Sequence, residues 1–237
     1  METLKIDMRQ WKYNMKIKNI YPYKDLKRND GGIRTYETKD GIKFPSVTSI
    51  LSVTQSEDKK KGLEKWKKRV GAKEASRIKR DAAKVGTSMH KYLENYLLDK
   101  GYVDDTRIGR IARPMAKEII KKGLVDLEEL WGSEVHLYYP GLYAGTTDVV
   151  GIYKGKPAIV DFKQTNRPKQ ESWVIDYKLQ LAAYAMAHNI LFDTKISTGI
   201  ILMCSRERYF QKFELTTEDY WYICCQWMTR VAKFYGD

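Results

Sequence analysis

The pattern of apolar positions changes along the chain from helical spacing to strand alternation. Val85, Met89, Leu93 and Tyr96 lie on one face of a helix that is predicted to stop at Gly101, and a further helix is predicted over 111–122. From residue 133 the period becomes two, which predicts three consecutive strands over 133–140, 146–153 and 156–163. The pattern therefore predicts a helical first half followed by a sheet.

Capping and turn residues delimit the other predicted elements. "IRTYETKDGIKF" alternates around Asp40 and Gly41 and predicts a small β-ribbon, and "PSVTSILS" predicts a short helix with Ser46 as its N-cap. A basic helix broken at Gly71 follows. After the three strands, a long helix is predicted within 171–189, two strands at "STGIILMC" and "RYFQKFEL", and a threonine-capped C-terminal helix. This order predicts an α+β (mixed α/β) fold, a central mixed β-sheet flanked by helices.

The length and composition favour one domain. The 237 residues are 43% hydrophobic, and no repeat or Pro/Gly/Ser-rich linker divides them. We expect a single domain over 1–237, with a mainly helical basic region over 1–130, a sheet core over 131–215 and the C-terminal helix over 216–237.

Hydropathy and cysteine content bear on the cellular compartment. No stretch approaches the roughly 18 apolar residues of a membrane span, and the start, "METLKIDMRQWKYN", lacks the apolar segment of a secretory signal. We therefore expect an intracellular protein, in the cytoplasm or in a host's cytoplasm if viral, without a membrane partner. Cys204, Cys224 and Cys225 are odd in number and lack CxxC spacing, which predicts buried thiols and no disulfide framework, zinc ribbon or iron–sulfur cluster.

Positive charge is concentrated in one segment. The formal net charge is +13, and residues 59–80 carry eleven basic side chains against Glu64 and Glu74. Such a charge attracts polyanions. The segment predicts a track for a phosphate backbone, and a solvated helix face is the alternative.

The hairpin formed by the second and third predicted strands combines apolar and charged residues. Asp161 and Lys163 share one face of the strand "AIVDFK", and Phe162 points to the other. A two-residue turn at Lys154 and Gly155 places Asp148 opposite Asp161. Opposed carboxylates, with Cβ atoms about 5 Å apart, destabilise a sheet unless a cation joins them. This register predicts a divalent metal site beside Lys163. The alternative is a structural Asp161–Lys163 ion pair with Asp148 turned outward.

Several motifs appear together in a characteristic order. "GTTD" followed by "VDFK" resembles the PD-(D/E)xK nuclease superfamily, whose core is a mixed sheet with its metal site on the second and third strands. "GTSMH" upstream and "QLAAY" downstream resemble the RecB-like branch, and "FPSVTSIL", "LEKWKKR" and "DFKQTNRPK" resemble the mitochondrial genome maintenance exonucleases. The likeness runs from about residue 44 to 190. Thr147 replaces the proline of the superfamily name, and the four cysteines of the iron–sulfur members are absent, which favours a cluster-free type.

The resemblance implies a role for individual residues. Asp148 and Asp161 would be metal ligands, Lys163 the catalytic lysine, and His90 an additional ligand that suits Mn²⁺ better than Mg²⁺. The substrate-facing pair would be Gln180 and Tyr184. Without the family, Tyr184 would be interpreted as a core residue and His90 as a surface histidine. The other candidates are Thr165, Arg167 and Lys169 as guides for the phosphate backbone, Trp66 as a base-stacking residue, Glu134 at either the site or a solvent edge, and His136 and His188 as structural residues.

The resulting hypothesis is Mg²⁺- or Mn²⁺-dependent hydrolysis of DNA phosphodiesters. A helical gateway over the metal site would favour an exonuclease acting on single-stranded or end-bearing DNA in replication, recombination or DNA processing. The size of the chain suggests a compact replicon such as a phage as its source. Two alternatives stay open. One is a structure-selective or restriction-type endonuclease that uses the same site, and the other is a non-catalytic accessory protein that binds single-stranded DNA.

Overall fold

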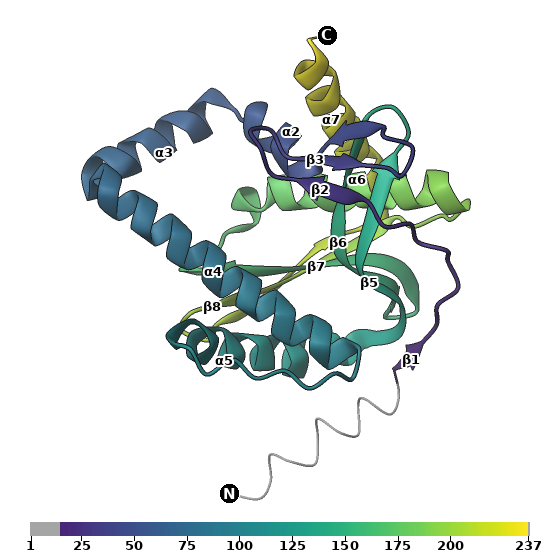
Figure 1. Ribbon diagram of the computed structural model, residues 1–237, viewed down its shortest axis with the longest axis horizontal. Helices are drawn as coiled ribbons and strands as arrows, with labels where there is room; N and C mark the ends of the chain where they lie inside the picture. The colour runs from purple at the N-terminus through teal and green to yellow at the C-terminus, as the bar shows by residue number, and fades with distance from the viewer. Residues whose placement is uncertain (1–14, 237) are drawn as a thin grey trace, which may run out of the picture.

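The computed structural model describes residues 15–236. A six-stranded mixed sheet forms the centre of the protein (Figure 1). The strand order is β1-β5-β6-β7-β8-β9, with β1 parallel to β5, β7 parallel to β8, and antiparallel pairing elsewhere. The strands span Lys16–Ile17 (β1), Leu127–Tyr139 (β5), Tyr143–Tyr153 (β6), Lys156–Thr165 (β7), Thr198–Ser205 (β8) and Phe210–Leu215 (β9). A second, antiparallel sheet contains Lys27–Asn29 (β2), Thr35–Glu37 (β3) and Lys43–Pro45 (β4).

Helices pack on both faces of the central sheet. They span Val47–Val53 (α2), Glu57–Val70 (α3), Ala72–Leu97 (α4), Arg107–Lys122 (α5), Ile175–Phe192 (α6) and Thr217–Tyr235 (α7), with 3-10 turns at Leu124–Asp126 (η1) and Glu171–Trp173 (η2). Because strand side chains alternate, Val160 of β7 joins a core with α4 and α5, and Ile159 joins a core with α2, α6 and α7. The predicted α+β fold, a mixed sheet flanked by helices, is confirmed.

The sequence predicted two features of the α2–α4 region correctly. The Ser46 side chain accepts a hydrogen bond from the Ser49 amide and caps α2. Gly71 separates α3 from α4 with a φ of 85°, which glycine adopts without the cost that a side chain would add. Figure 1 shows the resulting bend, at which α3 and α4 meet away from the central sheet.

Several predicted ends of helices and strands were wrong, and so was the prediction that all three cysteine thiols are buried. α4 ends at Leu97, before Gly101, because Asp99 adopts a left-handed φ of 57° and the Lys100 amide closes the helix by donating to Asn95 O at 2.8 Å. α5 begins at Arg107, where Thr106 caps it, and β5 begins at Leu127. Cys204 and Cys224 are buried but Cys225 is exposed, since consecutive helical residues point in different directions.

Two further expectations concern membrane-spanning helices and a secretory signal. Within residues 15–236, every helix is too short or too polar to cross a bilayer. The prediction that "METLKIDMRQWKYN" is no secretory signal falls on residues 1–14, outside the part of the chain that the structure describes.

Candidate metal-dependent active site

The β6–β7 hairpin has the predicted turn and register. Lys154 and Gly155 form the turn with φ values of 48° and 73°, and the pairing runs from Tyr153↔Lys156 to Val149↔Val160. One step further, this register would bring Asp148 opposite Asp161, but the ladder ends there. Instead, Asp148 Oδ2 accepts a hydrogen bond of 2.5 Å from the Phe162 amide. The strands therefore separate at the aspartates, and Asp148 bridges the gap.

Three potential metal ligands converge at this separation. His90 Nδ1 of α4 lies 2.9 Å from Asp148 Oδ1, and one ligand atom from each of His90, Glu134 and Asp148 lies within 4.8 Å of the other two. Glu134 holds a φ of 54° in the middle of β5, which is unfavourable for a residue with a side chain and is common where function constrains the backbone. Two carboxylates and one imidazole suit a divalent cation such as Mn²⁺ or Mg²⁺.

The electrostatics of these three residues favour bound positive charge. Burial alone would raise the pKa of Asp148, but His90, Lys163 and the Phe162 amide lower it. Burial and the Asp148 charge raise the pKa of Glu134 to about 7. Burial opposes protonation of His90, yet Asp148 outweighs it and raises the pKa of His90 to about 9. Glu134 and His90 thus hold protons more strongly than usual, whereas Asp148 stays ionised, and a divalent cation would balance the same negative charge.

Asp161 and Lys163 lie beside this group and contact each other. The Lys163 ammonium is paired with Asp161 Oδ2 and lies 5.1 Å from the centre of the Tyr177 ring. Burial alone would lower the pKa of Lys163, but Asp161 and Asp148 raise it, so the ammonium stays charged. The Asp161–Lys163 ion pair of the structural alternative is therefore present. Asp148, however, is only 6% exposed and points to His90, not outward as that alternative requires.

Gln180 of α6 contacts Asp161 directly, and Tyr184 of the same helix contacts Gln180. The Gln180 amide nitrogen donates to Asp161 Oδ1 at 3.3 Å and to the Tyr184 hydroxyl at 3.2 Å. Both side chains are buried. A Cβ atom at Gly145 would lie 2.7 Å from the Tyr184 ring, so this glycine makes room for the tyrosine. The observed contacts orient Asp161, and the substrate-facing role implied by the resemblance stays a prediction.

A groove with a volume of about 1180 Å³ runs beside Lys163, between α3 and the segment after β7. Its walls combine aromatic and basic side chains. The predicted residues along the groove are Trp66, Thr165, Arg167, Lys169 and Arg69, the last as part of the basic segment, and those that sequence analysis did not single out are Asn166, Trp173 and Tyr177. Thr165 is buried and donates to Arg167 O at 2.7 Å, so it shapes the loop after β7. Tyr177 precedes Gln180 by three residues on α6, which was the available signal that it shares the face toward the site.

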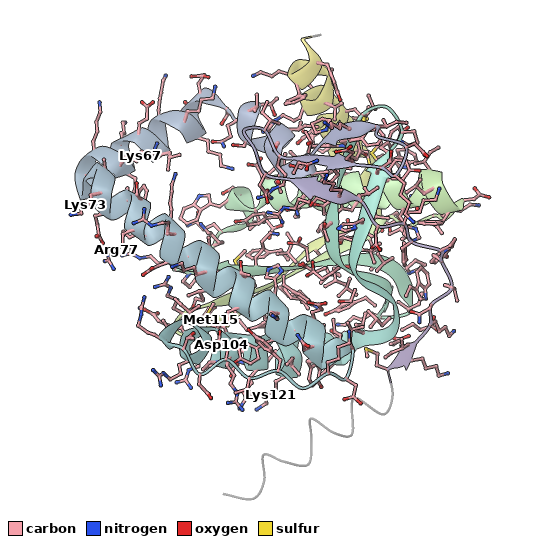
Figure 2. All side chains as sticks on the ribbon, in the orientation of Figure 1. Lys67, Lys73, Arg77, Asp104, Met115 and Lys121 are labelled. Atoms are coloured by element: carbon pink, nitrogen blue, oxygen red, sulfur yellow. The ribbon has the colours of Figure 1, made fainter. Side chains whose placement is uncertain are left out.

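The basic segment contributes to one wall of this groove, since its residue Arg69 lines it. All eleven basic side chains of residues 59–80 are exposed, and Figure 2 shows Lys67, Lys73 and Arg77 along the bend between α3 and α4. Lys59, Lys60 and Arg77 have acidic partners, whereas the others have none within 4 Å among residues 15–236. The concentration of unpaired positive charge supports the phosphate track more than a merely solvated helix face.

The two remaining histidines lie in packed surroundings. His188 is fully buried, where Tyr23 and Thr194 contact its ring nitrogens at 3.1 and 2.8 Å. His136 Nδ1 accepts a hydrogen bond from the Leu26 amide at 3.1 Å. Both are placed as structural residues would be.

Comparison with known proteins identifies relatives across most of the chain. Mitochondrial genome maintenance exonuclease 1 of Mus musculus is 26% identical over 208 residues, which cover 81% of this chain and 59% of that protein. The Homo sapiens protein of the same name is 25% identical over 204 residues, covering 81% and 58%. The Xenopus tropicalis protein is 26% identical over 173 residues, covering 69% and 49%. The chain thus spans between about half and six tenths of the length of these relatives.

Two other comparisons add little. No protein-family model matches the chain. A solved structure from Eubacterium rectale is similar over 65% of this chain and 66% of that one, with 15% sequence identity and a TM-score of 0.46. Because this TM-score is low, the likeness carries no argument about function. The homologues named mitochondrial genome maintenance exonuclease 1 support the assignment of this chain to a nuclease family.

Proposed function

We propose that the protein is a Mg²⁺- or Mn²⁺-dependent exonuclease that hydrolyses single-stranded DNA from an end. The observation that carries the proposal is the convergence of His90, Glu134 and Asp148 beside the Asp161–Lys163 pair, next to a basic groove with aromatic walls. The homologues named as exonucleases support the same reaction class. We place the activity inside the cell, in DNA replication, recombination or processing.

In this mechanism each protein group has a separate task. His90, Glu134 and Asp148 would hold the cation, with Asp161 as a further ligand that Gln180 orients. A cation held there would supply Lewis-acid chemistry for phosphodiester hydrolysis. Lys163, kept protonated by two carboxylates, stabilises the negative charge that develops on the phosphate. The reaction needs no covalent enzyme intermediate.

The groove supplies the path for the strand. Trp66, Trp173 and Tyr177 offer faces on which unpaired bases can stack, and Arg69, Arg167 and Lys169 offer positive charge to the backbone. Stacking of this kind requires bases that are not already paired, which favours a single strand. Helix α3 forms one wall of the groove, opposite the loop after β7. A strand held between these walls would enter most easily by an end.

The two alternatives make different demands on the same site. A non-catalytic DNA-binding protein has no need of converging carboxylates that repel phosphate, and the approach of Glu134 to the buried Asp148 therefore disfavours it. An endonuclease could use the identical metal site, because the distinction depends on how the strand reaches it.

A time course with strands labelled separately at the 5′ and 3′ ends tests the proposal, with a circular single strand as control. We expect metal-dependent release of short products from one labelled end and at least about tenfold slower cleavage of the circle, because the walls of the groove restrict access. Equal cleavage of the circle would favour the endonuclease. Binding without hydrolysis in either metal would favour the accessory protein.

A further inference from the structure

The junction of α2 and α3, where the α3 wall of the groove begins, is attached to the core by two charged residues. α2 ends at Val53, Thr54 follows as its C-cap, and Ser56 caps α3. The attachment matters because none of the α3 residues Glu57–Val70 is buried. This helix lacks an apolar face in the core, and its position depends on how its ends are held.

Arg230 of α7 holds the end of α2. Its guanidinium donates to the Thr54 hydroxyl at 2.5 Å and to Leu51 O at 2.7 Å, and it lies 3.5 Å from Asp176 Oδ1. Its side chain is only 18% exposed. A guanidinium group at the C-terminal end of a helix stabilises it in two ways. It donates hydrogen bonds to carbonyl oxygens that lack a partner within the helix, and its positive charge interacts favourably with the helix dipole.

Asp176 joins this attachment to α3. Its Oδ1 faces Arg230, and its Oδ2 forms an ion pair with Lys59 in the first turn of α3. Asp176 precedes Tyr177, which lines the groove, and Lys59 lies near enough to the groove residue Lys169 to add to the effect of burial in lowering the pKa of Lys169. The carboxylate therefore sits at the edge of the groove, between its α3 wall and Tyr177.

We propose that Arg230, Asp176 and Lys59 form a latch that keeps α3 at the groove and thereby makes cleavage depend on a free DNA end. The inference rests on the proposed function and adds specificity-determining residues that touch neither the metal ligands nor Lys163. Opening the latch would let α3 move away, so that an internal stretch of a strand could reach the site from the side.

A matched pair of variants on adjacent residues of α3 tests the latch. Lys59→Gln removes the link to Asp176, whereas Lys60→Gln removes the same charge but breaks only the local pair with Glu57 at 2.8 Å. Asp176→Asn weakens both links of the carboxylate. The readouts are the cleavage rates of a linear and a circular single strand, and the deuterium uptake of residues 55–70 in the 237-residue chain.

We expect Lys59→Gln to raise the circular-to-linear rate ratio by about three- to fivefold, the range of a single partly exposed ion pair, and Asp176→Asn to raise it further. Deuterium uptake in 55–70 should rise in both variants. Lys60→Gln should leave the circular-to-linear ratio and the uptake at their wild-type values, because the charge it removes from the basic segment slows both strands alike. Unchanged ratio and uptake in both latch variants would overturn the latch, as would equal changes in Lys60→Gln. If the wild type cleaved the circle as fast as the linear strand, the exonuclease proposal would fail, while the uptake would still decide whether the latch holds α3.

Discussion

Asp148→Asn is expected to reduce metal-dependent DNA hydrolysis by a factor on the order of 10³, the largest effect that we predict. Both carboxylate oxygens of Asp148 make contacts at the site. Oδ1 lies 2.9 Å from His90 Nδ1, and Oδ2 accepts a hydrogen bond of 2.5 Å from the Phe162 amide. Asparagine keeps the shape but replaces an anionic oxygen with an amide that binds divalent cations weakly. Turnover of a labelled single strand in saturating Mn²⁺ measures the loss.

Asp126→Asn is a matched control for this variant. Asp126 is also an aspartate in contact with basic side chains, Lys154 at 3.2 Å and Lys212 at 3.6 Å, but it lies outside the ligand group. We expect this variant to keep activity within about twofold of the wild type, since partly exposed ion pairs contribute little. An Asp148→Asn enzyme that folds normally, as judged by circular dichroism, and keeps more than a tenth of the activity would contradict the assigned role.

Lys163→Met is expected to lower the turnover number by about 10²- to 10³-fold, because it removes a prepositioned charge from the developing anion. Methionine keeps most of the apolar stem but removes the ammonium that pairs with Asp161 and lies 5.1 Å from the centre of the Tyr177 ring. DNA affinity should change much less than turnover, since the groove and the exposed basic segment supply most of the phosphate contacts. Single-turnover kinetics separate the two quantities.

Lys178→Met provides the comparison for the lysine. Lys178 is similarly shielded, with its side chain 14% exposed, and it pairs with Glu171 at 2.5 Å. Its replacement should leave turnover nearly unchanged. If Lys163→Met instead weakened DNA binding and left the single-turnover rate at saturation intact, Lys163 would be a binding residue and its catalytic assignment would be wrong.

The register of the hairpin could be derived from sequence because a short turn fixes it. Lys154 and Gly155 determined the pairing up to Val149 and Val160, and alternation then placed Asp161 and Lys163 on one face. The separation of the strands at the next step had no such local signal. It depends on the Asp148 side chain taking the Phe162 amide that a continued ladder would have used.

Glu134 shows the limit of pattern reasoning. Sequence analysis left open whether Glu134 faces the site or a solvent edge. In the structure its φ of 54° departs from strand geometry, which simple alternation along β5 does not predict. Only the assembled fold brings it near His90 and Asp148. Similarly, the resemblance implied Asp161 as the third ligand beside His90 and Asp148, whereas in the structure Asp161 contacts Gln180 and Lys163 and lies outside that three-residue group.

The groove and its latch arise from contacts between distant segments. Trp66 and Tyr177 are separated by the whole of α4, α5 and three strands of the central sheet, yet they line one groove. The break at Gly71 predicted the bend, but its direction depends on how α2 and α4 attach to the core. Arg230 and Asp176 carry no local motif, since each is an ordinary charged residue within a helix.

The central claim is that His90, Glu134 and Asp148 hold a divalent cation, and anomalous X-ray scattering from crystals grown with Mn²⁺ tests it most directly. The account predicts an anomalous peak within about 2–2.5 Å of ligand atoms from these residues, and its loss in Asp148→Asn. A well-ordered site without a peak, or a peak bound only by residues elsewhere, would contradict it.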